Sequence, residues 1–158
     1  MPTLYEQCGD TALAFIGSFQ GSVPEAIIAH RAKNCLHRIR SGSLSSGPMT
    51  NAEYCAWVKS LMPVMRTFQL HLQEGHLPII DATQRKVTLY LRSTSDTDFG
   101  NYSNEYIWIL SLDDTGRKVN DIMEFTDSEY TSNWIPKLMK AAVLKGTNMV
   151  SLGNYSRG

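Results

Sequence analysis

The main hydrophobic periodicity of this 158-residue chain changes from helical to strand-like near residue 68. Before that point, apolar side chains recur every three or four residues, which is the spacing of one face of an α-helix. After it they alternate with polar ones, as in Phe68, Leu70 and Leu72, which is the period of a half-buried strand. Helices followed by strands, rather than helices alternating with strands, predict an α+β fold.

Two helices are predicted at the start of the chain. Apolar residues at helical spacing predict the first over residues 4–19. The second is short and ends at His30, because Pro24 suits a first helical turn and Ser22 can cap it. A strand over 34–39 then leads into a Ser-, Gly- and Pro-rich loop over 41–49.

A third helix is predicted to begin after Thr50. Thr50 and Glu53 have the spacing of a capping box, in which each side chain accepts a hydrogen bond from a backbone N–H at the helix start. The apolar stripe of this helix runs to Met65, and Pro63 is expected to kink its last turn.

The second half of the chain predicts an antiparallel sheet and a closing helix. A tight turn at 113–116 joins the last two strands, since Asp and Gly favour turn conformations. The connection over 93–102 is polar and is expected to be a long loop. The strands are predicted at 68–72, 87–92, 104–112 and 119–127, the helix at 129–143, and a flexible tail at 146–158 after a single domain over 1–145.

Composition excludes several classes of partner. Fifteen basic and fifteen acidic residues cancel, so no electrostatic field favours nucleic acid or an anionic membrane. The N-terminus has no basic leader and no segment has the roughly 20 apolar residues that span a bilayer, so we expect a soluble, cytoplasmic protein. Cys8, Cys35 and Cys55 form no Cys-x-x-Cys pair, and neither a metal site nor a disulfide framework is predicted.

The last predicted strand carries three acids among apolar residues. A carboxylate on the buried face of a sheet is costly unless it is paired or used. The period of two separates the acids, because Glu124 shares a face with Ile122, whereas Asp121 and Asp127 lie on the opposite face. Glu124 is therefore the candidate for a buried functional acid.

This order of elements resembles the SnoaL-like branch of the nuclear-transport-factor-2-like superfamily, in which a curved sheet wraps around N-terminal helices as a cone. Five fragments in the right order resemble the fungal SnoaL-like isomerases of secondary metabolism, which rebuild a ring of meroterpenoids, and their relatives acting on xanthone-type polyketides. The fragments are Arg31-Ala-Lys-Asn-Cys35-Leu-His37-Arg-Ile, Ser43-Leu44, Met49-Thr-Asn-Ala-Glu53-Tyr54, Gly100-x-Tyr102-x-Asn104-Glu105-Tyr106 and Glu124-Phe-x-Asp127.

The resemblance implies a homodimeric, cofactor-free isomerase or cyclase that rearranges a bulky polyketide-derived small molecule by proton transfer. Such chemistry needs a base, an acid, and a donor that stabilises an enolate or oxyanion in a dry pocket. A dehydratase of the same fold would use the same groups. A non-catalytic dimer that binds a small molecule is the alternative from another class.

Four residues are candidates for catalysis. His37 and Glu124 are the expected proton carriers, since an imidazole titrates near neutral pH. Arg38 must point away from His37 across the strand, so one of the two is scaffolding. Asp127 either contributes a second carboxylate or caps the closing helix. Two alternatives are structural: His37 bonded to backbone, and Glu124 paired with an arginine, either Arg31 or Arg92.

The candidates for substrate binding come from several elements. Arg31 either grips an enolate or carboxylate or forms an ion pair at the helix-to-strand corner, and Tyr54 either donates a phenol hydrogen bond or fills the core. Trp57 and Met62 are expected in the pocket wall. Tyr90 and Arg92 share a strand face that lines either the far wall or a solvated edge.

The superfamily resemblance adds Tyr106 and Trp108 to the pocket-facing set, together with Glu124. It leaves Glu105 on the outer face of the sheet, as a candidate for the dimer interface. The substrate itself is not specified by these residues.

Overall fold

The structure is a computed structural model that describes residues 1–21, 23–40 and 47–147. The helices within these residues are α1 (Leu4–Gly17), α2 (Pro24–Ala29), α3 (Asn51–Leu61) and α4 (Ser128–Leu144). The strands are β1 (Arg31–Ile39), β2 (Gln69–Leu72), β3 (Ile79–Asp81), β4 (Lys86–Thr97), β5 (Gly100–Leu112) and β6 (Val119–Thr126). The α+β class is therefore confirmed.

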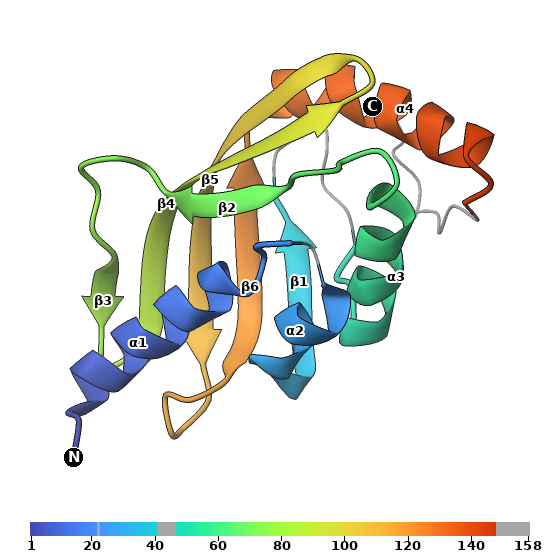
Figure 1. The fold of residues 1–158 in the computed structure, drawn as a ribbon. Helices are drawn as coiled ribbons and strands as arrows, with labels where there is room; N and C mark the ends of the chain where they lie inside the picture. The colour runs from blue at the N-terminus through green and yellow to red at the C-terminus, as the bar shows by residue number, and fades with distance from the viewer. Residues whose placement is uncertain (22, 41–46, 148–158) are drawn as a thin grey trace.

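The strands form one curved sheet in the order β1-β6-β5-β4-β2, and β3 pairs with β4 as well. Figure 1 shows α1 crossing one face of this sheet, α2 and α3 beside β1, and α4 at the far end of the long β4–β5 hairpin. All strand pairs are antiparallel except β1 and β6, which run parallel. The sheet is thus not purely antiparallel, because β1 reaches β6 after a long excursion of the chain rather than through a hairpin.

The helix starts follow local capping chemistry. The capping box predicted at Thr50 is confirmed, with the Thr50 amide donating to the Glu53 carboxylate at 2.8 Å. A second box at Thr3 and Glu6 starts α1 and was not predicted. The helix α3 ends at Leu61, so the predicted kink at Pro63 is wrong, because a proline nitrogen has no proton to continue the helix.

Two further predictions concern residues outside the described ranges. Ser22, the expected cap of α2, is one of them, and the N-cap of α2 is Val23, which makes no side-chain cap bond. The predicted loop at 41–49 and the tail at 146–158 are described only from 47 to 49 and from 146 to 147. The single-domain organisation over 1–145 stays a prediction.

The polar segment at 93–102 is not the long loop expected from its composition. Strands β4 and β5 continue through it and leave only Asp98 and Phe99 between them. Gly100, with a φ of 104°, opens β5 in a conformation that side-chain-bearing residues rarely adopt. The buried hydroxyls are satisfied within the hairpin, since the Thr97 hydroxyl donates to the Gly100 carbonyl at 2.6 Å.

The main core lies between α1 and the inner face of the sheet. Phe15 of α1 packs near Trp108 of β5, with ring centroids 6.2 Å apart. A second cluster joins α3 and α4 to the end of the hairpin through Leu61, Tyr102 and Leu138. None of the helices described is long and apolar enough to cross a membrane.

Candidate functional site

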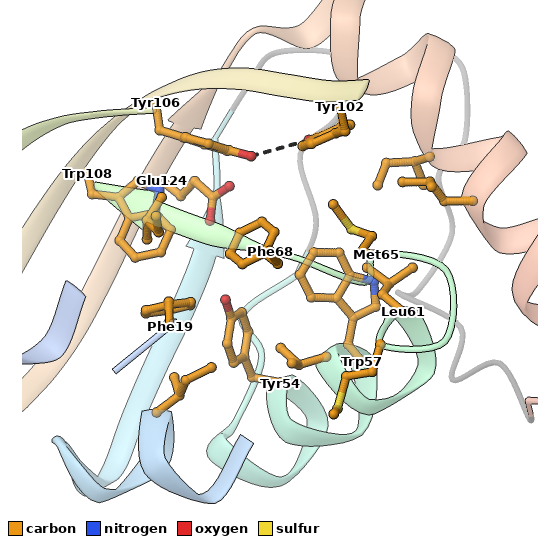
Figure 2. A pocket seen from close by; sticks show the side chains of 16 residues that line it. Phe19, Tyr54, Trp57, Leu61, Met65, Phe68, Tyr102, Tyr106, Trp108 and Glu124 are labelled. Carbon is orange, nitrogen blue, oxygen red and sulfur yellow. Dashed lines mark hydrogen bonds between the residues drawn. The ribbon is translucent and has the colours of Figure 1, made fainter. Parts of the chain in front are cut away.

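A pocket opens between the inner face of the sheet and the helices, and most of its wall is aromatic or aliphatic (Figure 2). Among the described residues that line it, Glu124 is the single carboxylate. The wall consists of Phe19, Ile27, Tyr54, Trp57, Val58, Leu61, Met62, Met65, Phe68, Leu70, Tyr102, Tyr106, Trp108, Ile135 and Leu138 in addition to Glu124. An apolar cavity with a few convergent polar groups is the usual form of a small-molecule site.

Glu124 lies in the middle of β6, directly opposite Trp108 of β5, and is 7% exposed. Its Oε2 is 2.6 Å from Nε2 of His37. No other donor contacts this carboxylate among the described residues, so Oε1 is left for a ligand in the pocket. The carboxylate can therefore accept a proton from a bound molecule while one of its oxygens stays fixed.

His37 is completely buried and does not line the pocket. Its Nδ1 is 3.2 Å from Nη2 of Arg31, and a guanidinium can only donate. Nδ1 must therefore be the acceptor, and the ring proton lies on Nε2, where it is donated to Glu124. Burial lowers the pKa of His37, which favours this neutral tautomer.

Arg31, at the start of β1, completes a buried chain of three polar side chains. It is 4% exposed, and its guanidinium carbon lies 4.0 Å from the centroid of the Tyr54 ring. Within the described part of the chain, its Nε and Nη1 have no hydrogen-bond partner, so the guanidinium is held mainly by its contact with His37. The sequence predicts Arg31 or Arg92 as a structural partner of Glu124, but the imidazole of His37 lies between Arg31 and Glu124, and Arg92 pairs with Glu105 instead.

Two phenols project into the same pocket from β5. The hydroxyls of Tyr102 and Tyr106 are hydrogen-bonded to each other (Figure 2), with their oxygens 3.2 Å apart. Ser93 Oγ lies 2.9 Å from the Tyr106 hydroxyl. Burial raises the pKa of Tyr102 to about 12 and that of Tyr106 well above its usual value. Both phenols therefore keep their protons at neutral pH and can donate to a ligand oxygen.

Tyr102 was missing from the predicted site. The period of two places Tyr102, Tyr106 and Trp108 on one face of β5, so the sequence did contain the signal. The polar composition around residue 102 hides this signal, because it predicts a loop there instead of a strand. Tyr54 also lines the pocket, stacked on His37 with centroids 4.5 Å apart, and burial raises the pKa of its phenol.

Other predicted site residues lie outside the pocket. Arg38 forms an ion pair with Asp121 on the outer face of the sheet, opposite to the face of His37. Asp127 is exposed and caps α4, accepting a hydrogen bond from the Tyr130 amide at 3.0 Å. Both side chains are therefore held in structural contacts away from Glu124.

The expected far wall of Tyr90 and Arg92 is also corrected. Arg92 pairs with Glu105, and its Nε donates to Gln73 at 2.9 Å. The Tyr90 hydroxyl donates to Glu105 at 3.2 Å. These contacts lie on the outer, partly solvated face of the sheet, so Tyr90 and Arg92 do not form the far wall of the pocket. Trp57 and Met62 are in the wall, where they were expected.

Sequence comparison finds relatives of known name across most of the chain. "Austinoid biosynthesis clusters protein H" of Penicillium brasilianum is 32% identical, over 81% of this chain and 88% of that protein. "Monooxygenase AacuP" of Aspergillus aculeatus is 30% identical, over 84% of this chain and 88% of that protein. No family model matches the chain.

Solved structures agree with these relatives. The BvnE pinacolase of Penicillium brevicompactum has a TM-score of 0.83 and 30% identity, over 89% of this chain and 96% of that one. The chain belongs to this fungal SnoaL-like family. A putative SnoaL-like polyketide cyclase of Shewanella denitrificans shares the family's fold, with a TM-score of 0.64 at 9% identity over 82% and 97% of the two chains. In the described residues of this family member, no three potential metal ligands lie together.

Proposed function

We propose that this protein is an acid–base isomerase that rearranges a polyketide-derived intermediate, of the meroterpenoid class, in fungal secondary metabolism, and that it works without a cofactor. The names of its relatives support the pathway class, since one belongs to austinoid biosynthesis and another is a pinacolase. The pocket supports the reaction class, because its polar groups are a carboxylate and phenols within an apolar wall.

The observation that carries the proposal is the pairing of Glu124 with Tyr102 and Tyr106 in one pocket. Glu124 takes a proton from the substrate, either from a hydroxyl or from a carbon next to a carbonyl. The phenols donate to the substrate oxygen that gains negative charge as bonds rearrange. In a water-poor cavity such donors stabilise charge more strongly than in water. The protonated Glu124 then returns its proton to the product.

His37 and Arg31 support Glu124 from behind in this proposal. The imidazole donates to Oε2 and so fixes the carboxylate, and the guanidinium places a positive charge next in the chain. His37 is thus a positioning residue, since its two ring nitrogens are both engaged and neither reaches the pocket. This differs from the proton-carrying role expected from the sequence.

The first experiment measures the mass of the product. The protein is expressed with its neighbouring biosynthetic genes, with and without Glu124→Gln, and the accumulating metabolites are compared by liquid chromatography and mass spectrometry. An isomerase gives a product with the mass of its substrate. A product lacking one water would favour the dehydratase, and one carrying an additional oxygen would favour the activity that the name of AacuP indicates.

The second experiment measures turnover once the substrate is isolated. Glu124→Gln keeps the shape of the side chain but removes the base, so turnover is expected to fall at least about 100-fold. Asp121→Asn is the matched control, because it changes an acid on the same strand that faces the outside. Wild-type turnover in both Glu124→Gln and the control would exclude Glu124 as the base.

We also propose that the protein is a homodimer that associates through the outer face of the sheet. Ile107 and Phe125 are directly opposite each other on that face and are 38% and 40% exposed. The ion pairs Arg92–Glu105 and Arg38–Asp121 lie on the same face and leave it without net charge from these four groups, so a second copy can approach without repulsion.

Light scattering after gel filtration tests the dimer. Ile107→Lys is expected to give monomers, because it buries a charge without a partner in the interface. Leu13→Lys is the control, since Leu13 is 46% exposed on α1 away from that face. A wild-type monomer at micromolar concentration would contradict the proposal, as would an Ile107→Lys dimer.

A further inference from the structure

Asn104 occupies the centre of a buried hydroxyl network next to the pocket but does not line the pocket itself. It is 2% exposed on β5, between Tyr102 and Tyr106 on the same strand face. Its Nδ2 lies 2.9 Å from the Tyr102 hydroxyl, 2.9 Å from the Thr131 hydroxyl and 3.1 Å from the Thr126 hydroxyl. The orientation of the side-chain amide decides which of these groups donate hydrogen bonds and which accept them.

The backbone settles the orientation of this amide. The Glu105 N–H donates to Oδ1 of Asn104 at 2.9 Å, and a peptide N–H cannot accept. The carbonyl of the side chain must therefore face the backbone, and the NH2 group must face the hydroxyls. This NH2 group has two protons to share among the three hydroxyls, and because an amide nitrogen only donates, the Tyr102 oxygen can act only as the acceptor in its contact with Asn104.

That assignment limits where the Tyr102 proton can point. The Tyr102 proton cannot point at Asn104, so it is directed to the Tyr106 oxygen, 3.2 Å away, or to a molecule in the pocket. When the Tyr106 oxygen accepts from Tyr102, its own proton is directed to Ser93 Oγ, at 2.9 Å, or again to a pocket ligand. Successive hydrogen bonds in one direction also strengthen one another.

We propose that Asn104 is a positioning residue that makes the Tyr102 and Tyr106 hydroxyls donate toward the pocket, so that this end binds an oxygen carrying negative charge. The inference rests on the proposed function, because it deepens the role given to the two phenols. Its ligand class is an enolate, alkoxide or phenolate oxygen. An ammonium group of a ligand, which can only donate hydrogen bonds, would face donors at this end and is not expected to bind there.

A phenol whose absorbance distinguishes its neutral and ionised forms serves as the probe. Its dissociation constant is measured with the full chain at pH values above and below the probe's own pKa. The wild-type protein is expected to bind the phenolate more tightly than the phenol. Asn104→Asp keeps the shape of the side chain, but its carboxylate accepts and draws the Tyr102 proton away from the pocket.

In Asn104→Asp the affinity for the phenolate is expected to fall at least about tenfold, while affinity for the neutral phenol changes less. Asn133→Asp is the matched control, since the same substitution is made at an exposed position of α4. Unchanged preference for the phenolate in a folded Asn104→Asp protein would overturn the inference.

Asn104→Ala provides a second route that buries no charge. If Asn104 acts through Tyr102, its loss should weaken phenolate binding in the wild type but have no further effect in a Tyr102→Phe background. Equal effects in both backgrounds would overturn the inference. If Tyr102→Phe and Tyr106→Phe do not alter phenolate binding at all, the donor role in the proposed function fails as well, so the two failures are distinguishable.

Discussion

Replacing His37 tests whether the imidazole holds the two buried charges on either side of it. His37→Phe keeps an aromatic ring against Tyr54, which stacks 4.5 Å away, so most of the packing is retained. What is lost is the bond from Arg31 at 3.2 Å and the bond to Glu124 at 2.6 Å. Hydrogen bonds to charged groups contribute about 1.5–3 kcal/mol each, so the free energy of unfolding should fall by about 3–6 kcal/mol.

Two further substitutions separate the bonds. An asparagine at position 37 offers an oxygen near the place of Nδ1 and retains an acceptor for Arg31. A glutamine offers an N–H near the place of Nε2 and retains a donor to Glu124. Each should lose about half of the effect of His37→Phe, about 1.5–3 kcal/mol, if the two bonds contribute independently.

Urea unfolding at about pH 8, above the unperturbed histidine pKa of about 6.5, measures all four proteins with His37 neutral. A domain is typically stable by about 5–15 kcal/mol, so the His37→Phe effect is a large and measurable share. A loss below about 1 kcal/mol in His37→Phe would refute the reasoning, since the Arg31 guanidinium and the Glu124 carboxylate would then not depend on the imidazole. The reasoning would also be refuted if the His37→Asn and His37→Gln proteins had a lower free energy of unfolding than the His37→Phe protein.

Three further predictions follow from the same contacts. Because burial lowers the pKa of His37, below about pH 6.5 this histidine binds a proton in the unfolded chain but not in the folded one, and the free energy of unfolding should fall as the pH drops. His37→Phe should remove this part of the pH dependence in urea titrations at several pH values. Asp127→Ala should lower the free energy of unfolding by about 1 kcal/mol through the lost cap of α4, and an unchanged urea midpoint would contradict the capping role. Arg38→Met should leave turnover at the wild-type value and change stability by no more than about 1 kcal/mol, because its ion pair with Asp121 is partly exposed; a large loss of turnover would return Arg38 to the site.

The sequence predicted the elements whose determinants are local. The capping box at Thr50 depends on residues three apart, and it appears where it was expected. The separation of Asp121 from Glu124 depends only on strand period, and Asp121 does face outward while Glu124 faces the pocket. The partner of Glu124 was not predictable in the same way. His37 is 87 residues away in the chain and meets it only because β1 and β6 pair in parallel.

The errors at Tyr90, Arg92 and Tyr102 have one cause. The β4–β5 hairpin turns at Asp98 and Phe99, and that turn sets Arg92 opposite Glu105. Residues directly opposite in an antiparallel pair share a face, and the sequence predicts Glu105 on the outer face, so the register alone would place Arg92 outside the pocket. The same register would have extended β5 back to Tyr102 and set it on the face of Tyr106. Polar composition concealed the turn, because the inner face at this end of the hairpin carries serine, threonine and asparagine, which are typical of exposed loops. In the folded chain Ser93 and Asn104 instead form hydrogen bonds with the phenols of the pocket.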